Sequence, residues 1–90
     1  MSQARIDQIR SRLESALTPM SLDIRDDSAM HAGHAGAQGG AGHYTVFIRA
    51  GAFQGLRRLQ RHRLVYDAVA DMMPGEIHAL SINATAPDEA

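Results

Sequence analysis

An α+β fold is predicted by two patterns in the sequence and by its length. Two stretches carry apolar residues at spacings of three and four, the period of a helix, and three shorter stretches alternate apolar and polar residues, the period of a strand. The chain of 90 residues is long enough to bury only one core. We therefore expect a single domain over residues 1–86, followed by a flexible tail over residues 87–90.

The first predicted helix covers residues 2–17. Its apolar residues fall on one face, and they are Ile6, Ile9, Leu13, Ala16 and Leu17. Ser2 is a suitable N-cap. The helix is expected to end at Thr18, because a residue that precedes proline is pushed out of the α region.

Two strands are predicted next, separated by a long loop. Residues 21–26 place Leu22 and Ile24 on one face and polar residues on the other, which is typical of a half-buried strand. Residues 27–43 have no periodicity, are rich in glycine and histidine, and read as a flexible loop. The alternation resumes over residues 44–49, so the two strands are expected to form a hairpin.

The second half of the chain predicts two helices and a third strand. A short helical turn before Gly55 leads into a long helix over residues 56–73, which a Pro-Gly pair ends. Residues 77–83 alternate as a strand, and residues 84–90 lack periodicity and are expected to fray. The predicted order is α-β-β-α-α-β, a three-stranded mixed sheet with the helices on one face.

The composition excludes several classes of function. There is no cysteine, so any metal ligand from this chain must be histidine, aspartate or glutamate. The formal net charge of −1 gives no global attraction to nucleic acid or anionic membranes. No apolar run approaches the roughly 20 residues of a membrane-spanning helix, and no catalytic motif is present. We expect a cytoplasmic protein that is not an enzyme and has no small-molecule substrate.

A cluster of arginines begins the long predicted helix. Its members are Arg57, Arg58, Arg61 and Arg63. Such a cluster can contact phosphates. The alternative is a solvated helix face, which the balancing acidic residues and the lack of interleaved aromatic residues favour.

The histidines are the second group of residues that could carry a function. His62 lies near the apolar stripe of its helix and is expected to be packed. His78 stands at the start of a strand, a rigid anchor for a metal, and His31, His34 and His43 offer neutral nitrogen donors from the loop. Two histidines make an incomplete site, so a cluster here would need thiolates from a partner chain. The alternative to a metal site is that the loop histidines are ordinary surface residues of a Gly-Ala loop.

Three motifs together carry a resemblance to a known family. They are Phe53-Gln54-Gly55, then Leu59-Gln60-Arg61-His62-Arg63-Leu64-Val65-Tyr66, then Ile77-His78-Ala79-Leu80. With them the chain strongly resembles the BolA family, from about Arg5 to Thr85. The resemblance implies a class II KH-like fold (K-homology), although Gly55-Leu56-Arg57-Arg58 lacks the second glycine of the Gly-x-x-Gly nucleic-acid loop.

The resemblance also implies a partner and a cofactor. Members of the family pair with monothiol glutaredoxins of the Cys-Gly-Phe-Ser type around a shared [2Fe-2S] cluster, in which glutathione takes part, and so act in iron-sulfur cluster assembly, trafficking or iron sensing. His78 matches the family's strand ligand, and His31 is the first choice for the loop ligand of the histidine-type branch, with His34 second. His43 matches a common family residue of structural or auxiliary role.

Some bacterial members of the family are DNA-binding transcriptional regulators, which is the alternative function. The family's helix-turn-helix-like part corresponds to residues 55–73 and would present the arginine cluster to DNA. The same arginines could instead meet an acidic face on the glutaredoxin.

Overall fold

The computed structural model describes residues 2–27, 42–73 and 75–89. Its elements are α1 (Ser2–Leu17), β1 (Ser21–Asp26), β2 (Gly42–Arg49), the 3-10 turn η3 (Gly51–Phe53), α2 (Arg58–Ala68), the 3-10 turn η4 (Ala70–Met72) and β3 (Ile77–Thr85). The strand order is β1-β2-β3, with β1 antiparallel and β3 parallel to β2. The predicted α+β fold and mixed sheet are confirmed.

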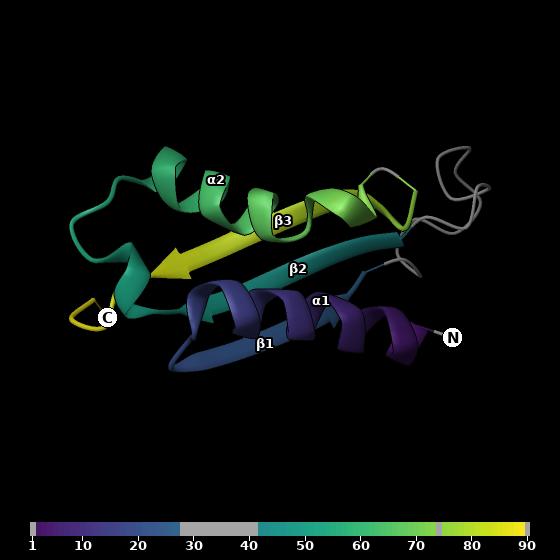
Figure 1. Ribbon diagram of the computed structural model, residues 1–90, viewed down its shortest axis with the longest axis horizontal. Coiled ribbons are helices and arrows are strands. Elements are labelled where there is room, and N and C mark those ends of the chain that lie inside the picture. Colours follow the sequence, from purple (N-terminus) through teal and green to yellow (C-terminus); the bar gives the residue numbers. More distant parts are fainter. Residues whose placement is uncertain (1, 28–41, 74, 90) are drawn as a thin grey trace.

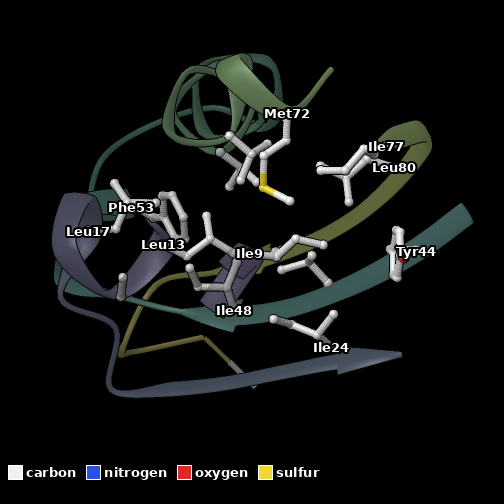
Figure 2. Packing of buried hydrophobic residues seen from close by; sticks show 14 of the residues in the cluster. Ile9, Leu13, Leu17, Ile24, Tyr44, Ile48, Phe53, Met72, Ile77 and Leu80 are labelled. Atoms are coloured by element: carbon white, nitrogen blue, oxygen red, sulfur yellow. The ribbon is translucent and has the colours of Figure 1, made fainter. Parts of the chain in front are cut away.

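The core lies between the helices and one face of the sheet. Both helices stand in front of the strands in Figure 1, and Figure 2 shows the buried side chains that fill the space between the layers. Along β2, Val46 and Ile48 point into this space, whereas Phe47 between them is 37% exposed. The other large buried residues are Ile9, Leu13, Leu17, Ile24, Tyr44, Phe53, Val65, Val69, Met72, Ile77 and Leu80.

The end of α1 follows from its sequence. Thr18 has a φ of 45°, in the left-handed region that commonly ends a helix, and its N–H donates to the carbonyl of Glu14 at 3.1 Å. Pro19 then prevents a further helical turn. The helix therefore spans the residues that were predicted for it.

The second long helix ends earlier than predicted. The α-helical bonds stop at Ala68, and the N–H of Val69 donates to the carbonyl of Tyr66, three residues back, at 3.2 Å. The turn η4 follows, in which residues three apart lie on the same side. Val69 and Met72 are both buried, so this turn keeps two apolar side chains in the core at the end of the helix.

Two strands are longer than predicted, and residues 84 and 85, which were expected to fray, belong to a strand. β2 begins at residue 42 rather than 44, and β3 continues to residue 85 rather than 83. Beyond β3, the Glu89 carboxylate accepts bonds of 2.6 and 2.8 Å from Arg61 and one of 2.9 Å from the Ala86 N–H. Arg49 donates to the Glu89 carbonyl at 2.8 Å. These bonds connect residue 89 with β2 and α2.

Candidate functional site

Two histidines lie side by side where the parallel strands β2 and β3 begin. His43 is the second residue of β2, and His78 is the second residue of β3. Their ring centroids are 5.0 Å apart, and the ring planes are inclined by 55°. His78 is exposed and His43 is half-buried, so the imidazole pair lies at the rim of the sheet, where a partner molecule can reach it.

A β-bulge places His78 in this position. Gly42 pairs with Ile77 and the next residue, His43, pairs with Ala79, so His78 is the extra residue of the bulge. Ile77 and Leu80 are 0% and 8% exposed, although they are three residues apart and strict alternation would send them to opposite faces. Without the extra residue, His78 would share the covered face with Leu80. The bulge therefore buries both apolar neighbours and leaves the imidazole exposed.

The spacing of the two rings suits a shared metal ion. When metal–nitrogen bonds are about 2.1 Å, two imidazoles on one tetrahedral ion have ring centres about 5 Å apart. The observed separation of 5.0 Å is close to this value, and it is also an ordinary distance between two packed aromatic rings. Within the described residues, however, no group of three or more histidine, cysteine, aspartate or glutamate side chains is suitable for a metal. The pair would supply at most two nitrogen ligands, and the described part of the chain offers no third beside them.

Asp27 fixes the end of β1 next to the histidine pair. Its N–H donates to the carbonyl of His43 at 2.7 Å, and its carboxylate accepts bonds from the Thr45 hydroxyl and, at 2.8 Å, from Arg25. The bond from Thr45, and next the one from Arg25, lower the pKa of Asp27 below its ordinary value of 3.8. Each carboxylate oxygen accepts one hydrogen bond, and the backbone bond to His43 ties the end of β1 to the start of β2.

The structure describes three of the five histidines that the sequence analysis considered. It brings His43, which the family resemblance left as structural or auxiliary, beside His78. The two preferred loop ligands, His31 and His34, lie outside the described residues. His62 is half-buried on α2 and faces a cavity at the opposite end of β3. The sequence holds a signal for the His43–His78 pair. The first residues of two neighbouring parallel strands meet at one edge of a sheet, and each histidine stands at the start of such a strand.

The four arginines of the predicted cluster divide into two groups. The side chain of Arg61 is only 11% exposed, and its guanidinium donates to the carbonyls of Leu56 and Ala84 and to the Glu89 carboxylate. Arg61 thus ties α2 to β3 and to the chain beyond it. Arg57, Arg58 and Arg63 are exposed, and none of them forms an ion pair within the described residues.

Comparison with known proteins identifies the family. A family model described as BolA-like protein matches residues 13–89. The chain belongs to the BolA-like family. The solved BolA domain of SufE1 from Arabidopsis thaliana superposes on it with a TM-score of 0.84 and 42% identity, covering 96% of this chain and 95% of that one.

Two curated relatives differ in name and in length. SufE-like protein 1, chloroplastic/mitochondrial, of Arabidopsis thaliana is 44% identical over 91% of this chain, which spans only 24% of that protein. The DNA-binding transcriptional regulator BolA of Escherichia coli (strain K12) is 31% identical over 86% of this chain and 70% of its own length.

The name of the first relative places that protein in chloroplasts or mitochondria. The cytoplasmic location expected for this BolA-like chain therefore stays a prediction. Among the described residues, no helix is long and apolar enough to cross a membrane.

Proposed function

We propose that this BolA-like protein is a non-enzymatic partner that supplies two imidazoles to a [2Fe-2S] cluster shared with a monothiol glutaredoxin and its bound glutathione. The observation that carries the proposal is the His43–His78 pair, whose rings are 5.0 Å apart at an accessible rim of the sheet. Its two nitrogen donors leave an incomplete ligand set, which a partner's thiolates would complete.

The chemistry of the donors suits such a shared centre. Imidazole replaces thiolate on iron and raises the reduction potential of the cluster relative to all-thiolate ligation. Because only a neutral imidazole binds metal, the complex should weaken when the histidines are protonated. The chain contains no cysteine, so it would not compete with the partner by forming a thiolate-ligated cluster of its own.

His78 is the fixed member of the proposed ligand pair, and the second member is one of three histidines. His43 is supported by its ring contact with His78. His31 and His34 are supported by the family resemblance of the segment in which they lie. A ligand can be told from a neighbour because only its removal changes the electronic environment of the iron.

The experiment is a titration of a cluster-loaded monothiol glutaredoxin with this protein, followed by visible absorption and circular dichroism. A saturable spectral change at one equivalent is expected for the wild type, and none for His78→Ala. Among His43→Ala, His31→Ala and His34→Ala, the variant that loses the spectral change identifies the second ligand. His62→Ala, which removes a histidine far from the pair, is the matched control.

Each failure has a distinct meaning. If His78→Ala gives the same spectral change as the wild type, the ligand assignment is rejected. No spectral change with the wild type, while calorimetry still detects complex formation, would make the protein a cluster-free interaction module for that glutaredoxin.

DNA binding is the second candidate function, and one observation favours it. Arg57 at the N-cap of α2 and Arg58 and Arg63 within the helix are exposed, and a family relative is named a DNA-binding transcriptional regulator. Each phosphate contact should make the logarithm of the affinity fall with the logarithm of salt concentration, with a slope of about −0.9 per contact. Arg58→Ala should reduce that slope, and Arg25→Ala, on the opposite edge strand, should not. A slope that Arg58→Ala leaves unchanged rejects phosphate contacts through this residue.

A further inference from the structure

A cavity separates the start of α2 from the outer edge of β3. Its volume is about 490 Å³, and its lining includes Arg58, Arg61, Glu89 and residues 82–85 of β3. β3 is an edge strand, because the sheet order is β1-β2-β3. Four consecutive residues of β3 line the cavity, so the backbone edge of the strand is accessible there.

Two carbonyls on this edge already have partners from α2. The Tyr66 hydroxyl donates to the carbonyl of Leu80 at 3.1 Å, and Arg61 donates to the carbonyl of Ala84 at 3.1 Å. Backbone groups of alternate strand residues point to the same side, so the N–H and C=O of Ile82 also face the outer edge, between the two capped positions. One backbone donor and one acceptor are thus presented together inside the cavity, as in a sheet edge that accepts an extended chain.

The charged residues of the cavity favour a carboxylate. Glu89 of the chain itself occupies one end, where Arg61 holds its carboxylate through two bonds of 2.6 and 2.8 Å. Arg58 lines the same cavity and forms no ion pair within the described residues. Because Arg61 neutralises Glu89, Arg58 remains as a single unneutralised guanidinium in the lining, which matches one acidic side chain rather than the row of phosphates of a nucleic acid.

We propose that this cavity binds an extended acidic segment of a partner protein. One residue of the segment would pair with the backbone of Ile82, and a neighbouring carboxylate would bind Arg58. The site shares no residue with the histidine pair and does not depend on the cluster proposal.

The test uses a capped pentapeptide with a central glutamate between valine pairs, and its glutamine counterpart. Each is titrated into the millimolar range while amide signals and hydrogen exchange are followed by NMR. The glutamate peptide should shift and protect the Ile82 amide, and Arg58→Ala should weaken its binding about tenfold. Arg63→Ala removes the same charge from α2 outside the cavity and should leave binding within about twofold. Arg58→Gln serves the same purpose as Arg58→Ala if the alanine variant folds poorly.

Three results would overturn the proposal. In the first, the glutamate peptide leaves the Ile82 amide unchanged. In the second, Arg58→Ala and Arg63→Ala weaken binding equally, which indicates only diffuse attraction. In the third, a short single-stranded oligodeoxynucleotide binds at this edge in competition with the peptide and more tightly, which would make the cavity a nucleic-acid site.

Discussion

Replacing Gly42 by alanine tests how the start of β2 positions the histidine pair. A Cβ atom at this position would lie 2.6 Å from Cε2 and from the hydroxyl oxygen of Tyr44, and 2.7 Å from Cζ. Ordinary contacts between carbon atoms are about 3.5–4.0 Å, so the ring or the strand must move by about 1 Å. Tyr44 is 2% exposed, so its ring is covered by neighbouring groups that must also shift if the ring moves.

The expected cost is that of an overpacked core, about 1–3 kcal/mol of unfolding free energy. Urea unfolding followed by circular dichroism measures it. Gly51→Ala is the matched control, because a Cβ atom there meets nothing within 4 Å, and it should stay within about 0.5 kcal/mol of the wild type. Gly42 directly precedes His43 at the bulge, so the ring signals of His43 and His78 should also move in NMR spectra, with His62 as the internal reference.

The reasoning fails if Gly42→Ala unfolds at the same urea concentration as the wild type, since the close contact would then be relieved without cost. It also fails if Gly51→Ala loses as much stability, because the loss would then reflect any glycine replacement. A third contrary result is a destabilised Gly42→Ala with unchanged His43 and His78 signals, which would show that the strand start does not position the pair.

Three further predictions concern stability. Phe53→Ala should cost about 3–5 kcal/mol in urea unfolding, because Phe53 is fully buried, and Phe53→Leu should cost clearly less; equal losses would contradict the packing argument. Gly55→Ala should cost about 1–2 kcal/mol through its φ of 78° alone, since a Cβ atom there meets nothing, so a neutral result would refute backbone strain. The pKa of Glu89 is lowered from 4.5 to about 2, chiefly by its bond from Arg61. The stability that Glu89 contributes is therefore present above pH 4.5 and lost as the pH falls towards 2. Thermal unfolding between these pH values should depend less on pH in Glu89→Gln than in the wild type, and Glu14→Gln should behave as the wild type.

Local periodicity predicted most of the fold because burial is decided by which face a side chain occupies. The helical spacing of Ile9 and Leu13 defined the buried face of α1, and both are fully buried. The directions of the strands followed from their connections, since a hairpin must be antiparallel and a helical crossover in one sheet makes parallel strands. Both pairings are observed.

The histidine pair could be predicted only in part. A regular strand over residues 77–83 would place His78 on the face of Leu80, and nothing in that segment marks an extra residue. The bulge depends on the pairing of Ile77 with Gly42, which lies 35 residues earlier in the chain. This pairing is favoured because it buries the side chain of Ile77. The burial of Arg61 is non-local in the same way, because its carboxylate partner, Glu89, lies 28 residues further along the chain.

The start and the second half of β3 present different chemical groups to different sides of the strand. His78 meets His43 across the β2–β3 pair at the start of the strand, whereas the backbone of Ile82 faces away from β2. Four residues of extended strand separate these positions by about 13 Å, and a standard protein interface of about 800 Å² on each partner extends further than that. A single partner could therefore bind at both places. Because the two sites share no side chain and no hydrogen bond, His78→Ala should remove cluster ligation without removing the edge contact, and Arg58→Ala should do the reverse.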